Sequence, residues 1–215
     1  MTDYHCHILP GVDDGFRTME NSLHCLDSYE QAGIAEVWLT PHIMEDIPNT
    51  TAALRERFEA LQQAYKGPVK LHLAAENMMD ELFEERLATG DVLPLCGENL
   101  LVETSYFNAP NRMDAILADV RYKGFTPVLA HPERYVYMEK DEYLRLRSQG
   151  VKFQLNLASL TGHYGPDAKR KAEQLLKLGC YSYVGTDLHR ERTFDELRCA
   201  DINKNIFDLL CQISY

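Results

Sequence analysis

The sequence has no cluster of basic residues that could form a nucleic-acid-binding stripe. It carries 33 acidic against 22 basic side chains, which gives a net charge of −11. Its densest basic patch is Lys169–Lys171, which we interpret as the solvated face of a helix. Because phosphate neutralisation supplies most of the affinity of a nucleic-acid binder, we expect no nucleic-acid partner.

Long hydrophobic runs and closely paired cysteines are also missing. No segment approaches the roughly 18 apolar residues of a membrane span. The N-terminal MTDYHCHILPG has neither the basic nor the apolar region of a signal peptide. Six cysteines, at positions 6, 25, 96, 180, 199 and 211, form no C-x-x-C pair and are typical of reduced thiols. We therefore expect a cytoplasmic protein without membrane insertion.

No linker rich in proline, glycine or serine divides the 215 residues. The chain is 26% charged and 45% hydrophobic, an ordinary globular composition that excludes a disordered or fibrous protein. A chain of this length can bury a sizeable core without disulfides. Residues 1–215 are predicted to form a single domain.

Helical patterns alternate with short β-rich runs along the chain. Apolar residues recur with the spacing of a one-sided buried helix over residues 54–65, 113–120 and 168–176. Helical patterns end at glycine, the residue favoured just beyond a helix, at positions 33, 124, 150 and 179. Seven strands are predicted, over residues 2–7, 36–42, 69–76, 100–106, 126–132, 152–157 and 181–189.

This alternation predicts an α/β protein whose parallel strands are covered by helices. Seven strands in a chain of this length favour a small closed (β/α) barrel, shorter than the typical eightfold barrel of about 250 residues. An open doubly wound sheet is the alternative.

Ionisable side chains gather at the C-terminal ends of these strands, where barrel enzymes hold their functional groups. His5 and His7 end the first strand, and Asp187 and His189 end the last. Each pair is spaced i, i+2, so both of its members face the same side of the strand. The sixth strand offers only Asn156. The other strand ends carry His42, Glu76, Glu103 and His131.

So many unpaired ionisable groups would be costly to bury, and metal coordination would remove that cost. Cys6 and Leu188 lie between the paired residues and should face the helix layer, so no thiolate is required. Such a set suits Zn, Mn or Fe, and its size implies more than one ion. The remaining histidines are interpreted as structural: His24, His72 and His163.

Several short motifs occur together and in a specific order: H-C-H-I-L-P-G-V-D-D-G at 5–15, T-P-H at 40–42, A-E at 75–76, E at 103, H-P-E-R-Y at 131–135 and D-L-H at 187–189. Together they resemble the polymerase-and-histidinol-phosphatase (PHP) superfamily. Within it, they are most similar to the bacterial capsule and exopolysaccharide tyrosine-protein phosphatases of the CpsB/CapC type. The resemblance covers nearly the whole chain.

The resemblance implies a PHP-type distorted (β/α)7 barrel that binds two or three divalent metal ions (Mn, Fe or Zn). One ion would be held by His5, His7, Glu76 and Asp187. A second would be held by Glu76, Glu103 and His131, with Glu76 bridging, and a third by Asp14, His42 and His189. Asp14 lies in a loop and enters this set through the resemblance alone.

Two arginines are also implied to contact phosphate. Arg134 matches the family's arginine in H-P-E-R-Y. A second family arginine follows the D-x-H motif, where Arg190 and Arg192 both qualify, and we prefer Arg192.

By this resemblance, the chain is a metal-dependent protein-tyrosine phosphatase. Its partner would be a phosphotyrosine-bearing protein, in the family usually a tyrosine kinase of polysaccharide export with a phosphorylated tyrosine tail. A cysteine-based mechanism is set aside, because none of the six cysteines has an arginine six positions on, as the C-x5-R loop requires.

Two alternatives stay open. The first is a small-molecule phosphatase such as a histidinol phosphatase, which only the shape of the pocket would distinguish. Tyr106, Phe107 and Tyr135 flank predicted ligands and could wall a cleft. The second is a metal-bound barrel that serves as a regulatory or binding module, against which the complete ligand set argues.

Overall fold

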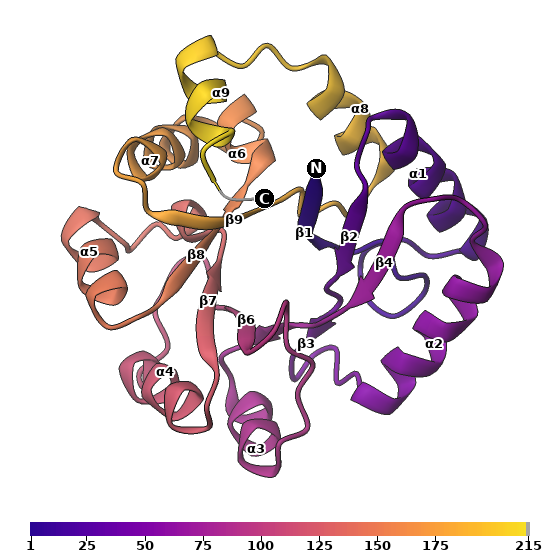
Figure 1. The fold of residues 1–215 in the computed structure, drawn as a ribbon. Helices are drawn as coiled ribbons and strands as arrows, with labels where there is room; N and C mark the ends of the chain where they lie inside the picture. Colours follow the sequence, from indigo (N-terminus) through magenta and orange to yellow (C-terminus); the bar gives the residue numbers. More distant parts are fainter. Residues whose placement is uncertain (214–215) are drawn as a thin grey trace.

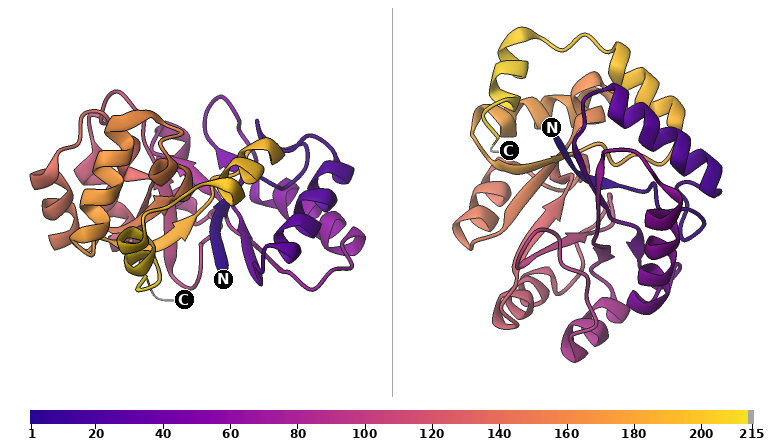
Figure 2. Two further views of the ribbon diagram at one scale, coloured as in Figure 1. Left: turned by 90° about the horizontal axis from the view of Figure 1, so that it is seen from above. Right: turned by 45° about the vertical axis from the view of Figure 1, so that its right-hand side comes forward.

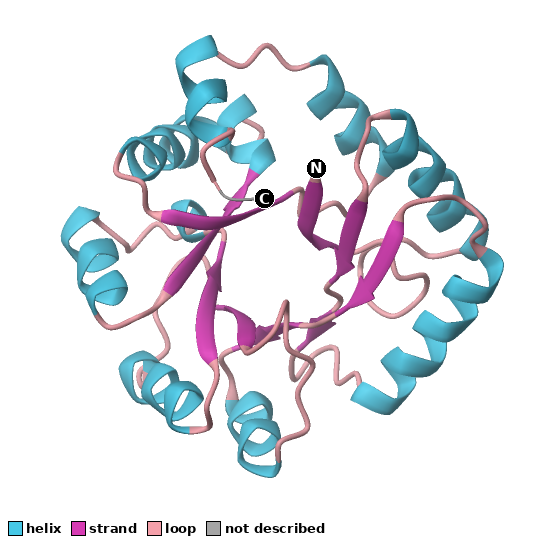
Figure 3. Cartoon of the chain, in the orientation of Figure 1, coloured by secondary structure: helices cyan, strands magenta, loops and turns pink. Residues whose placement is uncertain are grey.

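A computed structural model describes residues 1–213 and shows a ring of strands enclosed by helices (Figures 1 and 3). The left view of Figure 2 shows the barrel from the side, with the N-terminus of the first strand at its lower edge. The strands are β1 (Thr2–Cys6), β2 (Glu36–Leu39), β3 (His42–Ile43), β4 (Lys70–Leu73), β5 (Glu76–Met78), β6 (Asn99–Glu103), β7 (Thr126–Ala130), β8 (Lys152–Asn156) and β9 (Tyr181–Gly185). The helices are α1 (Met19–Gln31), α2 (Thr51–Ala64), α3 (Glu81–Thr89), α4 (Met113–Tyr122), the 3-10 turn η1 (Pro132–Arg134), α5 (Lys140–Ser148), α6 (Leu157–Thr161), α7 (Gly165–Lys177), α8 (Glu191–Cys199) and α9 (Lys204–Leu210).

All the strands pair in parallel, in the orders β1-β2-β4 and β3-β5-β6-β7-β8-β9. Two predicted strands are each broken in the middle, into β2 with β3 and β4 with β5. Hydrogen bonding continues across the break, since Ala74 N donates to Leu39 O at 2.9 Å and Glu76 N to Pro41 O at 3.1 Å. Counted as continuous strands, the members of the ring follow the predicted sevenfold order.

The ring closes where β1 meets the end of β9, a contact that we call the seam. Asp187 N donates to His5 O at 2.7 Å, and His7 N donates to Leu188 O at 3.0 Å. These bonds make the sheet a closed barrel rather than the open doubly wound alternative.

The buried carboxylate of Asp3 stabilises the seam through hydrogen bonds. Asp3 accepts hydrogen bonds from Tyr29 Oη at 2.8 Å, from Thr186 Oγ1 at 2.7 Å and N at 2.9 Å, and from His5 N at 3.2 Å. Burial raises the pKa of Asp3, and these donors partly offset that effect. One side chain thereby joins β1, α1 and the end of β9.

Replacing Asp3 with alanine should lower the free energy of unfolding by about 2–4 kcal/mol, because several buried donors lose their acceptor. Urea unfolding of chelator-treated protein measures this without a contribution from metal binding. Asp3→Asn keeps the size and one acceptor oxygen, so it should lose less. An unchanged urea midpoint for Asp3→Ala would show that the network does not hold the seam.

Five strands end earlier than predicted, namely β1, β6, β7, β8 and β9, and two of these ends lie one or two residues before a candidate metal ligand with positive φ. β7 ends at Ala130 and β9 at Gly185. His131 and Asp187 have φ angles of 32° and 52°, and they are the non-glycine residues of the described chain with positive φ. Such backbone is strained for these residue types and gathers at functional sites, so the strand ends are shaped for the site.

The predicted helical stripes at 54–65, 113–120 and 168–176 correspond to α2, α4 and α7. α2 begins after Thr50, whose side chain accepts a hydrogen bond from Ala53 N. The four predicted glycine stops follow the ends of α1, α4, α5 and α7.

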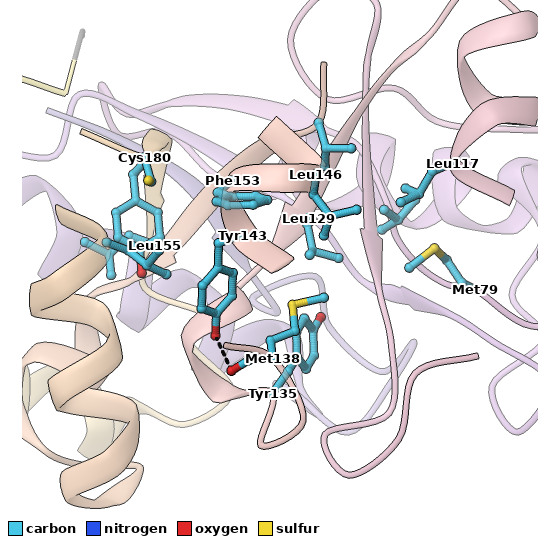
Figure 4. Packing of buried hydrophobic residues seen from close by; sticks show 14 of the residues in the cluster. Met79, Leu117, Leu129, Tyr135, Met138, Tyr143, Leu146, Phe153, Leu155 and Cys180 are labelled. Carbon is cyan, nitrogen blue, oxygen red and sulfur yellow. Dashed lines mark hydrogen bonds between the residues drawn. The ribbon is translucent and has the colours of Figure 1, made fainter. Parts of the chain in front are cut away.

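Two apolar clusters fill the space between the strands and the helices. One lies under α3–α7 against β6–β9, and Figure 4 shows its packing around residues such as Phe153 and Leu129. The other lies under α1 and α2, and it includes Cys6 and Leu188, which face the helix layer as predicted. Among the helices of residues 1–213, none has both the length and the apolar character needed to cross a bilayer.

The interpretation of Lys169–Lys171 as a wholly solvated face was wrong for one residue. Lys171 is only 2% exposed, and its Nζ donates to Tyr135 O at 2.9 Å. This hydrogen bond therefore fixes the segment that follows η1 to α7. Sequence spacing placed Lys171 on α7 but could not show that a loop carbonyl lies over it.

Candidate metal centre

The nine predicted ligands form one connected group of side chains at or just beyond the ends of the strands. They come from β1 and the segment after it, from the beginnings of β3 and β5, from the end of β6, and from the segments after β7 and β9. These residues are His5, His7, Asp14, His42, Glu76, Glu103, His131, Asp187 and His189.

The first subset is fully buried and contains His5, His7, Glu76 and Asp187. His5 Nε2 lies 3.1 Å from His7 Nε2, 3.2 Å from Glu76 Oε2 and 3.4 Å from Asp187 Oδ1. His7 Nε2 lies 3.4 Å and 3.3 Å from the same two oxygens. This grouping is the one that the resemblance implied for the first ion.

The second subset combines His42, Glu76 and Glu103. His42 Nδ1 lies 3.1 Å from an oxygen of each carboxylate. His131 stands beside them, with its Nε2 3.0 Å from Glu76 Oε1 and 3.8 Å from Glu103 Oε2. Glu76 thus contributes one oxygen toward His5, His7 and His42, and the other toward His131.

The third subset combines His7, Asp14, His42 and His189. Asp14 Oδ1 lies 3.3 Å from His189 Nε2 and 3.6 Å from His42 Nε2. The rings of His7 and His189 are stacked, with centroids 3.9 Å apart. His7 and His42 therefore each take part in two subsets.

The donor set passes a test of fit for divalent cations. His42 Nδ1, Glu76 Oε2 and Glu103 Oε1 are buried and have no hydrogen-bond partner within residues 1–213. Buried polar atoms normally find partners, so three of them converging on one point would be costly unless they share a cation. Imidazole nitrogen and carboxylate oxygen are ligands that Zn, Mn and Fe accept.

The electrostatics of the centre also favour positive charge. Burial lowers the pKa of His5, but the Glu76 and Asp187 carboxylates outweigh it and raise the pKa above its ordinary value. Burial and His7 lower the pKa of His42, yet the carboxylates beside it raise that pKa to about 10. Burial raises the pKa of Glu76, and the surrounding histidines hold it well below its usual range.

An outer shell of acceptors orients the histidine rings. His7 Nδ1 lies 2.7 Å from Asp13 Oδ2, His5 Nδ1 lies 2.9 Å from Gln154 Oε1, and His189 Nδ1 lies 2.9 Å from Asp187 O. In each case, Nδ1 donates and the Nε2 lone pair is left facing the centre. Sequence analysis missed Asp13 and Gln154 in this role. The signals were the doubled aspartate at 13–14 and a polar residue inside the apolar run KFQLNL.

Two glycines let the backbone come close to the ligands. A Cβ on Gly185 would lie 2.4 Å from His5 Cβ, and one on Gly15 would lie 2.2 Å from His7 O. Gly185 is packed against His5 and Gly15 against His7, so no larger side chain fits at either position without moving a ligand.

The two predicted arginines have different surroundings. Arg134 is 14% exposed, and its Nη1 donates to Asp187 Oδ2 at 2.6 Å. Arg192 is 89% exposed and pairs with Glu196 on the surface of α8, at 3.0 Å. Arg190 is also exposed.

The histidines interpreted as structural lie in other surroundings. His24 pairs with Glu191, His163 pairs with Glu196, and His72 stacks on Trp38. The three aromatic residues that flank the ligands also differ from one another: Tyr106 is partly buried, Phe107 is exposed and Tyr135 is fully buried.

Comparison with known proteins places the chain among phosphatases of capsule synthesis. It is 30% identical over 200 residues to the tyrosine-protein phosphatase YwqE of Bacillus subtilis, covering 90% of this chain and 79% of that protein. It is 26% identical over 208 residues to the tyrosine-protein phosphatase CpsB of Streptococcus agalactiae serotype V, covering 88% and 83%.

Solved structures agree with the sequence relatives. A crystal structure from the pair YwqE of Bacillus subtilis and CpsB of Streptococcus pneumoniae, described as metal-dependent tyrosine phosphatases, matches with a TM-score of 0.81 and 29% identity. The match covers 90% of this chain and 81% of that one. An inactive dihydroorotase-like domain of Chaetomium thermophilum shares the fold, with a TM-score of 0.52 and 12% identity over 98% of this chain and 69% of that one.

The family described as capsular polysaccharide synthesis, CpsB/CapC, matches residues 1–205. That match covers nearly the whole chain, and the ligand clusters described above lie within it. The chain therefore belongs to the CpsB/CapC family.

Proposed function

We propose that this chain hydrolyses phosphotyrosine in proteins, with two or three divalent ions held by the nine side chains listed above. The observation that carries the proposal is the buried Glu76 carboxylate, whose oxygens face four histidines. Arg134 beside this cluster adds a fixed positive charge. We assign the activity to a single domain over residues 1–215, of which 214 and 215 lie outside the described residues, and to the cytoplasm.

The bound ions would be Mn, Fe or Zn, and they would lower the pKa of water and polarise phosphoryl oxygens. The chain's own residues prepare the site for this chemistry. Asp13 and Gln154 hold the rings of His7 and His5 with Nε2 inward. Arg134 donates to non-bridging phosphoryl oxygens, where charge develops in the transition state. Arg192 is proposed as the second phosphate contact, which it would make by leaving its pairing with Glu196.

The rim of the site supports a protein substrate. Phe107 is 70% exposed and Val136 is 54% exposed. Val136 N donates to Tyr106 O at 2.9 Å, so the two segments lie side by side next to Arg134. Exposed apolar side chains beside a phosphate-binding group suit the residues that flank a phosphotyrosine. We infer a phosphotyrosine-bearing partner, with the tail of a bacterial tyrosine kinase as the proposed substrate.

Metal removal and substrate choice test the proposal together. Exhaustive chelation should abolish turnover, and added Mn²⁺ should restore it, whereas thiol alkylation should change kcat little. With metal restored, kcat/KM should be higher for a phosphotyrosyl peptide than for a phosphoserine peptide or histidinol phosphate. Phenolate is a better leaving group than an alkoxide, which favours the aryl ester.

Each arm has an outcome that would contradict the proposal. Full activity after exhaustive chelation would exclude metal dependence. A clear preference for histidinol phosphate would assign the same metal site to small-molecule chemistry. Binding of a phosphopeptide without turnover would favour a regulatory module.

A further inference from the structure

The guanidinium group of Arg134 lies over two tyrosine rings. Its Cζ is 4.4 Å from the centroid of Tyr106 and 4.0 Å from the centroid of Tyr164. Tyr106 follows β6 and Tyr164 precedes α7, so the rings reach Arg134 from separate parts of the barrel. Both distances are within the range in which an aromatic face attracts a cation.

A hydrogen-bonded chain links one of these rings to the metal centre. Asn156 Nδ2 donates to Asp187 Oδ2 at 2.9 Å and lies 3.3 Å from Tyr164 Oη. Arg134 Nη1 donates to the same Asp187 oxygen at 2.6 Å. Asp187 therefore has one oxygen toward the histidines and the other fixed by Asn156 and Arg134. The sixth strand, which has no ligand of its own, contributes Asn156 to this support.

These contacts limit the freedom of a long side chain. A free arginine side chain has large rotamer entropy, which must be lost when it binds a phosphoryl group unless the side chain is already ordered. The two rings and Asp187 already contact the guanidinium. Its remaining N–H donors lie in the plane of the group, where they suit oxygens of one phosphoryl group.

We propose that Tyr164 is a positioning residue for the reaction, whose ring, together with that of Tyr106, holds Arg134 in the orientation that meets the substrate phosphoryl group. The proposal rests on the proposed phosphatase function. Tyr164 acts through Arg134 and is not itself assigned to metal or substrate.

The test compares Tyr164→Leu with Tyr164→Phe in protein reconstituted with Mn²⁺. The leucine variant loses the ring, and its kcat/KM for p-nitrophenyl phosphate should fall about tenfold, the size of a partly desolvated cation–π contact. The phenylalanine variant keeps the ring face and should stay within about twofold of wild type. Metal content should be unchanged in both. Tyr122→Leu, on an exposed ring of α4, is the control for a tyrosine lost elsewhere.

A double-mutant cycle separates positioning from general packing. In an Arg134→Ala background, Tyr164→Leu should cause no further loss, because the group that it positions is absent. A similar loss in the presence and absence of Arg134, or equal losses in the leucine and phenylalanine variants, would overturn the proposal. If Tyr164→Leu does not fold, Tyr106→Leu with Tyr106→Phe makes the same comparison on the other ring.

A binding measurement keeps this inference distinct from the proposed function. Inorganic phosphate titrated into the Mn²⁺-loaded protein should bind about tenfold more weakly to Tyr164→Leu and equally well to Tyr164→Phe. Unchanged phosphate affinity in the leucine variant would overturn the positioning role. A wild-type protein that hydrolyses no phosphate ester would instead refute the proposed function, and the phosphate titration would still decide the role of Tyr164.

Discussion

Replacing Glu76 with alanine is expected to remove both bound metal and turnover, with kcat at least about 10³-fold lower. The reason is geometric. Glu76 Oε2 lies within 3.4 Å of nitrogens of His5, His7 and His42, and Oε1 lies 3.0 Å from His131. Among the residues described, no other carboxylate of the centre approaches all four of these histidines, so its loss leaves the imidazoles without their shared anion.

Elemental analysis and steady-state kinetics on the same preparations measure both effects. His5→Ala should behave similarly, because His5 faces the same oxygen. His72→Ala is the matched control, since His72 stacks on Trp38 away from the ligand group. A comparable loss of kcat in all three variants would mean that the division of the histidines into metal ligands and structural residues is wrong.

Replacing Arg134 with alanine should lower kcat/KM by about 10²–10³ while metal content stays the same, as expected when one transition-state charge contact is lost. The metal should remain because Asp187 keeps its bond from Asn156 and its approach to both His5 and His7. Arg134 stays protonated in the native protein. Burial lowers its pKa, but contact with Asp187 more than compensates and raises it.

Arg134→Lys should recover little of this activity, because an ammonium group lacks the planar fork that can both stack on tyrosine and donate twice to phosphate. Metal analysis and kcat/KM on a phosphotyrosyl peptide decide the outcome. Loss of bound metal in Arg134→Ala would assign the arginine to holding Asp187 rather than substrate.

Much of the fold could be predicted because apolar spacing and glycine stops are local signals. Strand alternation, which places i and i+2 on one side, predicted that His5 and His7 converge, and their Nε2 atoms lie 3.1 Å apart. Asp187 and His189 also reach the centre, but from the segment beyond β9 rather than from a strand. Asp14 was reached only through the resemblance, because it lies in a loop without a period. The predicted strands that correspond to β7 and β9 extend too far, since nothing in the composition marks the left-handed backbone at His131 and Asp187.

What could not be predicted depends on pairings between distant elements. Gln154 and Asn156 orient His5 and Asp187, from which they are 149 and 31 positions away in the sequence. Lys171 was predicted to be solvated, because the sequence does not show that the carbonyl oxygen of Tyr135 accepts a hydrogen bond from its Nζ. Gln154 and Asn156 lie in the apolar run KFQLNL, which is a signal for burial but does not name the partner, whereas Lys171 lies in a basic run that gives no such signal.

The seam also sets an order of events while the chain is being made. β1 is synthesised before the other strands of the barrel. The ring, however, closes on residues that include Thr186, which lies 183 positions after Asp3. At typical synthesis rates, this separation corresponds to roughly 10–40 seconds between the emergence of the two edges. During that interval, His5 and His7 have no Asp187 beside them, and the long-range pairing of β1 with the end of β9 must come late. The nascent chain therefore lacks part of the proposed ligand set until β9 and the segment after it are made, so we expect a fragment that ends before β9 to be inactive.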